Sequence, residues 1–555
     1  MDIISEINNA VALSKNREYK KAEEIYLSVL KQDKDNSVVL SLLGLLYMNT
    51  GKFKKSEKYL SEAMAIKPST PAIEGLGIVK SYLKKNKEAV EYFKQIIPKT
   101  KSFEVYDRYI KILIESKENS KAHKYAQKCY ELYPMKPESL NNLAFTGIHA
   151  GKLKEAFKYA QQLVKQHPKY ADGWLTYGLV LEMLYHDDEN AGNCFKKAYD
   201  LGAKEAAGYN LAVSYEKRGE YKKALYYANK LKKINPYDVS LDFLFVNIYF
   251  KQRKFKQAEK YYLNYVTNFP LKERKSLISR MKRLWYGKIN KSTKNETLFV
   301  FCDQGIGDGL MFIRYINFLE KYFKEIKVMC SKKFIELLKN SFSDHKNIKF
   351  YPASKIFPRY DKSVILSSLP IILKMGFDNI PFTEKYLSVN GEIIKKYSKK
   401  IKSDKLKVGI CWESGGIGWR ELLNRTLNIS LYEPFLKLKD ADYFSLQVNP
   451  TMDNYKNYDL KDLGKDFKDF NDTAGAIKNL DIVITVDTSV AHLAGALGVK
   501  TFMLLPYCPD WRWFDCDNNT DWYKSVRIFK QTDPTNWDEP INRIKNELLK
   551  LIKEK

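Results

Sequence analysis

The hydrophobic positions of this chain follow a new pattern after about residue 296, where short continuous apolar runs replace a helical spacing. Ile482–Val486 is one such run, rich in β-branched residues, as expected for a parallel strand covered on both faces. The polar residues Asp487–Ser489 follow it and favour the start of a helix, which the pattern predicts over 490–497. Gly498 suits the end of that helix, and 501–505 is the next buried strand. We therefore predict a strand–helix–strand unit here.

The polar turn Asp487–Ser489 is a candidate site for an anion. The first N–H groups of a helix have no partner within it, and the positive end of the helix dipole lies beside them. These two features favour a bound phosphate. Asp487 itself suits a helix cap, or a hydroxyl or sugar partner, better than the phosphate.

A second candidate turn carries three glycines and an aspartate. A buried strand is predicted at 297–302, the sequence DQGIGDG follows it, and a helix is predicted over 310–323. Ligands of open α/β folds lie at the carboxyl ends of parallel strands, where this turn and Asp308 would lie. Glycines leave room for a ligand to approach the backbone closely. The three glycines are Gly305, Gly307 and Gly309.

A third turn follows the strand predicted at 408–412. It contains Ser414 and Gly415, Arg425 comes shortly after it, and Gln447 ends the next predicted strand. Strands that alternate with helices and end in such turns predict two consecutive Rossmann-like halves. With their turns facing one another, two such halves describe the GT-B architecture. We expect the first half over 296–404 and the second over 405–555.

Residues 1–270 follow a repeating pattern instead. Pro134 and Pro168 are 34 residues apart, as are Pro236 and Pro270, and small residues keep the same register. A 34-residue period resembles the tetratricopeptide repeat, in which each unit is a pair of helices. We expect about eight units. Their ranges are 3–36, 37–70, 70–102, 103–136, 137–170, 171–204, 205–238 and 239–270.

An array of this kind predicts a peptide-binding groove. Each helix pair buries its apolar stripe only against its neighbours, so the array forms a superhelix with a concave face. Asn142 and Asn210 occupy equivalent positions on first helices, where a side-chain amide could bind a peptide backbone. The alternative is that both are solvated polar positions.

Residues 271–295 hold nine Lys/Arg and one acid. The spacing of their apolar residues predicts an amphipathic helix that caps the array. The alternative is a helix that contacts a membrane surface.

Composition narrows the classes of partner. The hydrophobic content of 45% supports real cores, and no apolar run approaches the roughly 18 residues that cross a bilayer. No signal peptide is visible and the seven cysteines lack metal-ligand spacing, so we expect a cytoplasmic protein with reduced thiols. The net charge of +28 attracts acidic partners, such as a nucleotide sugar, an acidic protein or the inner face of a membrane. We expect no nucleic-acid binding, because no nucleic-acid module is present.

Two motifs resemble a known enzyme family. GDGLMFIRYI after the first strand and DTSVAHLAGALG after the late one resemble the paired signatures of glycosyltransferase family nine, the heptosyltransferases of bacterial surface polysaccharide. The tail LLPYCPDWRWFDCDNNTDWYKSVRIFKQ more closely resembles bacterial proteins that join tetratricopeptide repeats to such a domain, including enzymes thought to glycosylate flagellin with nonulosonic acids. The layout is also similar to O-GlcNAc transferase, without a close motif match. The specific motifs cover 297–537, and the first half is short for the family.

The resemblance implies roles for individual residues. Asp308 matches the family's catalytic base, which takes the proton of the acceptor hydroxyl; the alternative is a loop aspartate that caps a helix. The nucleotide-sugar motif matches Asp487, Thr488, Ser489 and His492, which implies that Thr488, Ser489 and His492 donate hydrogen bonds to the phosphate. For His492 the alternative is a structural histidine.

Further residues are assigned more loosely. Arg425 would neutralise the leaving phosphate, unless it is a surface arginine. Gln447 is a candidate partner of the base or ribose. Arg512 and its two tryptophan neighbours either line the cleft or pack. No pair of carboxylates has metal-binding spacing, so we expect no metal and no cofactor beyond the nucleotide-sugar donor.

Three functions fit this pattern. The first is an inverting, metal-independent glycosyltransferase that modifies a hydroxyl of a protein, with flagellin as one candidate acceptor, held by the repeats. The second is a glycosyltransferase for lipopolysaccharide or another surface glycan. The third is a scaffold with a degenerate transferase domain. Heptose with ADP, a nonulosonic acid with CMP and hexosamine with UDP remain open as donors.

Overall fold

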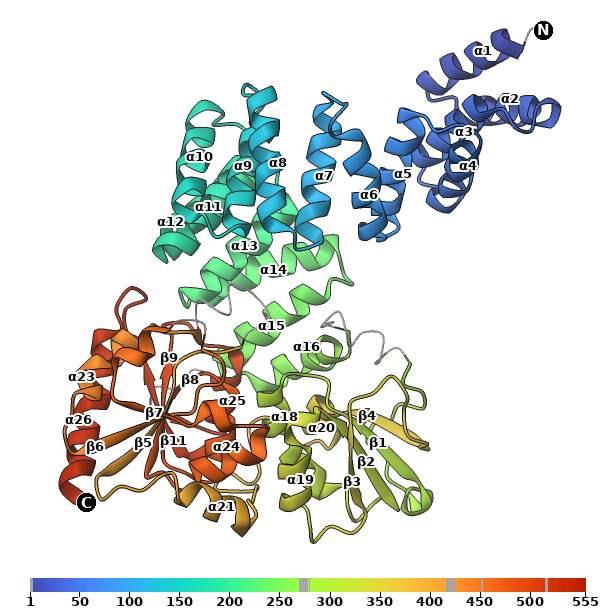
Figure 1. The fold of residues 1–555 in the computed structure, drawn as a ribbon. Coiled ribbons are helices and arrows are strands. Elements are labelled where there is room, and N and C mark those ends of the chain that lie inside the picture. The colour runs from blue at the N-terminus through green and yellow to red at the C-terminus, as the bar shows by residue number, and fades with distance from the viewer. Residues whose placement is uncertain (1–2, 269–277, 279, 416–424, 451–452, 515–517) are drawn as a thin grey trace. The chain divides into compact units, whose positions relative to one another are not determined.

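The computed structural model describes residues 3–268, 278, 280–415, 425–450, 453–514 and 518–555 (Figure 1). By its internal contacts the chain divides into two compact units, Met1–Gly208 and Tyr209–Lys555. The first unit is helical, and the second joins further helices to two parallel sheets. The predicted succession of a tetratricopeptide array and an α/β region is therefore confirmed, whereas the predicted domain ranges stay predictions.

The helices of the array follow one another along the chain, with short turns between them (Figure 1). Those of the first unit are α1 Ile3–Lys15, α2 Tyr19–Gln32, α3 Ser37–Asn49, α4 Phe53–Ile66, α5 Thr70–Tyr82, α6 Asn86–Ile96, α7 Phe103–Glu115, α8 Asn119–Leu132, α9 Pro137–His149, α10 Leu153–Gln166, α11 Ala171–Tyr185 and α12 Asp188–Asp200. α13 Lys204–Lys217 crosses into the second unit, and it is followed by α14 Tyr221–Ile234, α15 Val239–Lys251 and α16 Phe255–Asn268. Each consecutive pair corresponds to one expected repeat.

Small residues set the spacing between helices of the array. A Cβ on Gly44 would lie 2.6 Å from Leu60 Cγ, and one on Gly178 would lie 2.6 Å from Phe195 Cε1, so any larger residue would separate the paired helices. Gly151 ends the turn after α9 with a φ of +75°, a conformation that side-chain-bearing residues rarely adopt. The periodic small residues of the sequence thus correspond to close helix contacts.

The second unit contains two parallel sheets. The four-stranded sheet has the order β3-β2-β1-β4 and the seven-stranded sheet the order β10-β11-β9-β8-β5-β6-β7, with only β10 antiparallel among the described strands. The strands are β1 Thr297–Phe301, β2 Glu325–Cys330, β3 Ile348–Pro352, β4 Lys362–Ile365, β5 Leu406–Cys411, β6 Ala441–Ser445, β7 Leu460–Asp462, β8 Ile482–Val486, β9 Thr501–Leu505, β10 Asn519–Thr520 and β11 Tyr523–Lys530.

Helices cover both faces of the larger sheet. α24 Phe470–Ile477 and α25 Ser489–Ala496 share a core with one face of it, and α23 Glu433–Leu436 and the last helix, α26 Asp538–Glu554, share a core with the other. The smaller sheet packs with α18 Ile306–Phe312 and α19 Ile335–Ser341, and two further short helices are α20 Leu369–Ile372 and α21 Gly391–Ser398. Burial on both faces explains why the strands read as continuous apolar runs.

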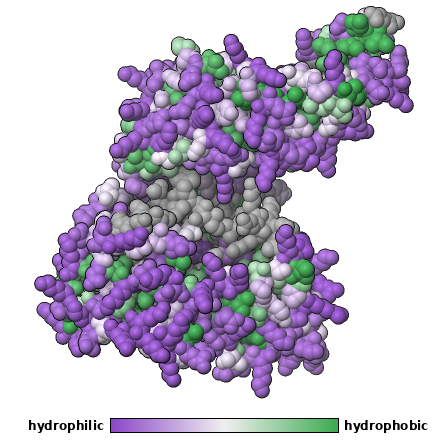
Figure 2. Space-filling view, in the orientation of Figure 1, coloured by the Kyte–Doolittle hydropathy of each residue, from purple (hydrophilic) through white to green (hydrophobic). Residues whose placement is uncertain are grey.

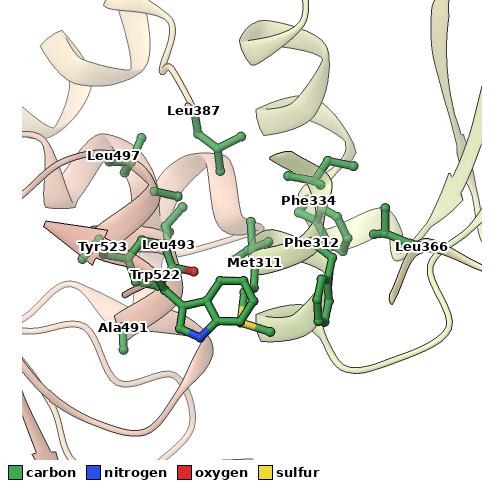
Figure 3. Packing of buried hydrophobic residues seen from close by; sticks show 14 of the residues in the cluster. Met311, Phe312, Phe334, Leu366, Leu387, Ala491, Leu493, Leu497, Trp522 and Tyr523 are labelled. Atoms are coloured by element: carbon green, nitrogen blue, oxygen red, sulfur yellow. The ribbon is translucent and has the colours of Figure 1, made fainter. Parts of the chain in front are cut away.

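One hydrophobic cluster joins the two sheets and the last pair of array helices. Phe250 of α15 and Tyr262 of α16 belong to the same buried cluster as Met311 and Phe312 of α18 and Trp522 beside β11. Figure 3 shows Met311 lying beside the ring of Trp522, and the rings of Phe312 and Trp522 meet edge to face with centroids 5.8 Å apart. This core of the second unit is therefore shared by both sheets and by α15 and α16.

Two local expectations differ from the structure. The helix predicted over 310–323 begins at Ile306 and continues after Phe312 as a 3₁₀ helix, Ile313–Phe318. Asp308 thus lies in the first helical turn, where the dipole favours a carboxylate. Of the segment 271–295, in which an amphipathic helix was predicted, residues 271–277 and 279 lie outside the described residues. Among residues 280–295 that helix is absent, and Lys291–Asn295 form a 3₁₀ helix instead. Leu284 forms a parallel bridge with Ser363 of β4, so this part of the segment is extended and lies along the sheet edge instead of forming a helix.

The surface gives little evidence of a large apolar patch. On the face drawn in Figure 2 most of the described residues are hydrophilic. Large apolar side chains that are well exposed include Met135 and Tyr237. Among the described residues, no helix combines the length and the apolar character needed to cross a membrane.

Candidate functional site

The two predicted ligand turns meet where α18 contacts α25. A Cβ on Gly307 of α18 would lie 2.8 Å from Cδ2 of His492 and 3.6 Å from the Cα of Ser489. These residues are far apart in the sequence, yet the two motifs form one helix contact. The structure therefore brings together the DQGIGDG turn and the DTSVAH segment, and Arg425 and Arg512 bind side chains of these two motifs.

Asp308 forms an ion pair with an arginine of the second half. Its Oδ1 accepts a hydrogen bond of 2.5 Å from Nε of Arg512, and Nη1 of the same guanidinium donates to Oδ1 of Asp510 at 2.7 Å. The side chains of Asp308 and Arg512 are 13% and 15% exposed, so the pair is partly shielded from water. Because Asp308 and Asp510 flank Arg512, they hold the pKa of its guanidinium well above the usual range, against the opposing effect of burial. This pairing was not predicted.

Arg425 is paired with Asp487. Its Nε donates to the backbone oxygen of Asp487 at 2.9 Å and lies 3.2 Å from Oδ2 of the same residue. Asp487 is 3% exposed, and burial raises the pKa of its carboxyl although Arg425 opposes that shift. Its Oδ1 is buried with no hydrogen-bond partner among the described residues, although a buried polar atom ordinarily has one. Asp487 is thus a buried acceptor, and the indole of Trp513, whose Nε1 is also buried without a hydrogen-bond partner in the described part of the chain, opposes the rise of its pKa.

Thr488 caps α25, whereas Ser489 remains accessible. The Oγ1 of Thr488 accepts a hydrogen bond of 3.1 Å from the N–H of Val490 and lies 3.1 Å from Oγ1 of Thr485. Thr488 is 5% exposed, while Ser489 is half-buried. The cap predicted for this turn is therefore present, and of the two hydroxyls that of Ser489 is the more open to a ligand.

His492 is enclosed by other side chains. Its Nδ1 lies 3.0 Å from the hydroxyl of Tyr523, and its ring stacks on Trp513 with centroids 5.1 Å apart and planes at 17°. Burial, together with the nearby cations Arg512 and Arg425, holds the pKa of His492 well below its usual range, so the ring is neutral. These contacts fit the structural alternative, and the predicted hydrogen bond to a phosphate stays a prediction.

The three glycines of the DQGIGDG turn lie close to other side chains of the protein. The space that a side chain on Gly307 would need is occupied by His492, and on Gly309 it is occupied by the ring of Phe334, 3.0 Å away. At Gly305 the nearest atom is Oδ2 of Asp308, at 3.4 Å. Packing of α18 therefore explains Gly307 and Gly309, and of the three glycines only Gly305 keeps space for the predicted ligand.

Gln447 supports the end of β5. Its Oε1 accepts hydrogen bonds from the N–H groups of Trp412 and Glu413, at 3.2 and 3.0 Å. Ser414 is buried and its N–H donates to Oγ1 of Thr426 at 3.2 Å, while Gly415 is exposed. Residues 416–424, which follow this turn, lie outside the described residues. The contacts of Gln447 are structural, and its predicted contact with a base or ribose stays a prediction.

Asn142 is bonded within the array. It lies on α9, is 8% exposed, and its Nδ2 donates to Oδ1 of Asp107 at 2.8 Å. Asn210 lies half-buried on α13. A peptide bound by Asn142 would have to compete with Asp107, so peptide binding through these two amides stays a prediction.

Sequence reasoning missed two buried charged groups. Arg314 is completely buried, and its guanidinium donates to the backbone oxygens of Met311, Pro381 and Trp522. It stands inside the GDGLMFIRYI motif, where a single charge in an apolar run was the available signal. Asp303, at the end of β1, accepts hydrogen bonds from the N–H and hydroxyl of Ser367, and burial raises its pKa to about 6.

The arrangement combines a carboxylate, two arginines and an open helix N-terminus. Carboxylates such as Asp308 can accept a proton, and arginines can bind an anionic group through a planar pair of donors. The N-terminal turn of α25 adds backbone donors. Among the described residues, no group of three or more His, Cys, Asp or Glu is placed to hold a metal ion.

Comparisons with known proteins identify the repeats. Models of the tetratricopeptide repeat family match residues 39–70 and 206–236. The chain is 29% identical over 163 residues to the protein O-mannosyl-transferase TMTC1 of Homo sapiens, a match that covers 28% of this chain and 18% of that protein. The chain thus matches less than a fifth of this relative's length, and its predicted tetratricopeptide repeats are confirmed at the matched positions.

Several solved structures are similar to parts of the chain. A tetratricopeptide repeat protein from Parabacteroides merdae ATCC 43184 is 13% identical, with a TM-score of 0.38, and the match covers 42% of this chain and 93% of that one. YrrB, described as a repeat protein with an unusual peptide-binding site, is 18% identical with a TM-score of 0.29, covering 33% of this chain and 95% of its own. PilF of Pseudomonas aeruginosa is 19% identical with a TM-score of 0.30, covering 36% and 92%.

Proposed function

We propose that this protein is a glycosyltransferase that moves a sugar from a nucleotide-sugar donor to a hydroxyl of a protein bound by its repeats. The observation that carries the proposal is the contact between α18 and α25, which groups Asp308 with the turn Asp487–Ser489. A base and an anion-binding turn in one place are what sugar transfer to a hydroxyl requires. The partial similarity to an O-mannosyl-transferase supports the same class of reaction.

In this proposal the two halves act as a GT-B pair similar to glycosyltransferase family nine. The N-terminal turn of α25 and Arg425 bind the phosphate of the donor, and Asp487 accepts a hydrogen bond from a hydroxyl of the sugar or ribose. Asp308 takes the proton of the acceptor hydroxyl as its oxygen attacks the anomeric carbon, and the nucleotide leaves from the opposite side. The configuration therefore inverts, without a metal ion. The acceptor is a serine or threonine of a protein, with flagellin as one candidate.

The test begins with binding and then measures transfer. Titration of ADP, CMP and UDP against the full chain identifies the nucleotide, and the matching nucleotide sugars are then incubated with candidate acceptor proteins, with and without EDTA. Mass spectrometry locates the label. Label on a peptide, unchanged by EDTA, supports the proposal. Label on a glycolipid favours a glycan transferase instead, and no transfer or hydrolysis with any donor favours a scaffold.

Asp308→Asn tests the base directly. We expect transfer to fall by about 10²- to 10⁴-fold, because a general base contributes in this range, while the affinity for the nucleotide stays within about 3-fold. Asp344→Asn is the matched control, because Asp344 is an exposed residue of the same half. Unchanged turnover in Asp308→Asn would remove this residue from the mechanism.

A further inference from the structure

Three consecutive residues, Trp511–Trp513, form a short 3₁₀ turn that touches three parts of the second unit. The ring of Trp511 stacks on Phe250 of α15, with centroids 4.9 Å apart and planes at 21°. The ring of Trp513 stacks on His492 of α25. Both tryptophans are almost completely buried. We call this segment the WRW turn. Its two outer residues join α15, in the last pair of array helices, to α25, which follows the turn Asp487–Ser489.

The middle residue of the WRW turn reaches the first half. Arg512 uses Nε for Asp308 and Nη1 for Asp510, so the planar guanidinium holds two carboxylates at a fixed separation. Asp510 caps the turn by accepting from the N–H of Arg512 at 3.0 Å, and the backbone oxygen of Arg512 accepts from Nε1 of Trp522 at 2.6 Å. The guanidinium also lies over the ring of Trp511, 4.8 Å from its centroid. Arg512 is therefore held on several sides.

This arrangement leaves one oxygen of Asp308 for a substrate. Oδ1 is bound to Arg512, whereas Oδ2 has no hydrogen-bond partner among the described residues. A carboxylate that is fixed through one oxygen presents the other in a constant direction. Catalytic groups lose much of their effect when their orientation is not maintained by such supporting contacts.

We propose that Arg512 is the positioning residue of Asp308: it holds Oδ1 so that Oδ2 faces the acceptor hydroxyl, and the WRW turn fixes Arg512 against α15 and α25. This inference rests on the proposed function, in which Asp308 accepts the proton. It assigns to Arg512 a role in orienting the base and none in binding the donor. The tryptophans on either side of Arg512 act through it, by keeping the turn in place.

The position of Phe514 supports a turn that is held by its surroundings. Its φ of +52° lies in the left-handed region, which a bulky residue adopts only when neighbouring contacts impose it. The ring of Phe514 packs against Phe250, with centroids 5.7 Å apart, and against Trp522, with centroids 6.2 Å apart. The same core that encloses Trp511 therefore fixes the end of the turn.

The experiment compares Arg512→Gln and Arg512→Lys in the full chain, using the donor that the wild type accepts. We expect Arg512→Gln to lower kcat by about 10²-fold, the size of effect that a misplacement of about 1 Å produces, with the KM for the donor and the Kd for the free nucleotide within about 3-fold. Arg512→Lys should recover part of kcat, because it restores the charge without the fork. Arg527→Gln is the control. Arg527 lies on β11, and its side chain is 45% exposed, compared with 15% for Arg512.

A double variant separates positioning from an independent role. If Arg512 acts only through Asp308, Asp308→Asn combined with Arg512→Gln should be no slower than Asp308→Asn alone, because residues that act as a unit are not additive. Further loss in the double variant would overturn the inference. So would a nucleotide Kd weakened more than about 10-fold at unchanged kcat, which would place Arg512 on the donor.

Folding and function are controlled separately. Thermal unfolding of each variant shows what fraction is folded, and a loss of activity that only follows the unfolded fraction would also overturn the inference. Arg512→Lys provides a second variant with a smaller perturbation. If the wild type transfers no sugar, the proposed function and this inference fail together. If the wild type is active, Asp308→Asn is inactive and Arg512→Gln is normal, only this inference fails.

Discussion

The repeat array and the α/β region use contacts of very different sequence separation. In the array, Nδ2 of Asn142 binds Asp107 and Oγ1 of Thr176 binds Asn141, and each pair is 35 residues apart, about one repeat. In the α/β region, Arg512 reaches across 204 residues to Asp308, and Arg314 reaches across 208 residues to Trp522. The array is therefore built from neighbours, whereas the candidate site depends on contacts between distant segments.

This difference predicts two kinds of response to mutation. The stability of an array is close to a sum of repeats and their interfaces, so a lost contact should weaken one region only. The largest core of the α/β region is shared by both sheets and by α15 and α16, so a lost contact in it should be felt in both sheets. Three substitutions examine this contrast, beginning with the largest expected effect.

Arg314→Met should destabilise the second unit most. The change leaves the buried backbone oxygens of Met311, Pro381 and Trp522 without their donor, and each such group costs about 1–3 kcal/mol, so we expect a loss of about 4 kcal/mol in the free energy of unfolding. Hydrogen exchange followed by mass spectrometry should show lost protection in both sheets and normal protection in α1–α12. Lys321→Met, at an exposed position, is the control. Equal loss of protection in α1–α12 would contradict the contrast.

Asp303→Asn should change how stability depends on pH. Burial raises the pKa of Asp303 from its ordinary 3.8 to about 6, so the folded state binds this proton more tightly than the unfolded state, and stability falls as pH rises from about 4 to 6. A pKa rise of this size corresponds to about 3 kcal/mol. In Asp303→Asn, the unfolding free energy at pH 4 minus that at pH 7 should be lower than in the wild type by about this amount.

Urea denaturation at both pH values measures the Asp303 effect. Asp459→Asn, at an exposed position, provides the control and should keep the wild-type pH dependence. A wild-type pH dependence in Asp303→Asn as well would mean that Asp303 is not the buried group responsible.

Asn142→Ala should have the smallest effect. It removes one hydrogen bond to Asp107, and bonds of this kind contribute about 1 kcal/mol, with Asp107 still paired with Lys111. Exchange should accelerate in α7 and α9 and stay normal in the sheets. Asn49→Ala, at an exposed site on α3, serves as the comparison. Loss of protection in the sheets would show that the array is not as local as its contacts suggest.

Elements with a strong local signal were predictable from the sequence. The strands at 482–486 and 501–505 coincide with β8 and β9, because their burial on both faces makes them continuous apolar runs. The helix pairs of the array were predictable because the 34-residue period repeats the same local contacts. The start of α18 was misjudged by four residues, since glycines suggest a loop unless a tertiary contact with His492 and Phe334 requires them.

The candidate site was predictable only in part. Asp308, Arg425 and the turn Asp487–Ser489 do come together. The ion pairs of Arg425 with Asp487 and of Arg512 with Asp308 could not be predicted, because no local sequence pattern indicates them. Asp303 and Arg314 were missed for a similar reason. A charged residue in the sequence reads as solvated, and only the burial of its surroundings shows that it is enclosed.

The sequence by itself determined the helix pairs of the array, the most apolar strands and the order in which array and sheets follow. Periodicity is a local property, and it survives in the order of the residues. The tertiary structure alone decided that Arg512 meets Asp308, that His492 is enclosed by Trp513 and Tyr523, and that α15 and α16 share the core of the sheets. These contacts join residues separated by tens to hundreds of positions, and such partners are selected by packing and charge in three dimensions.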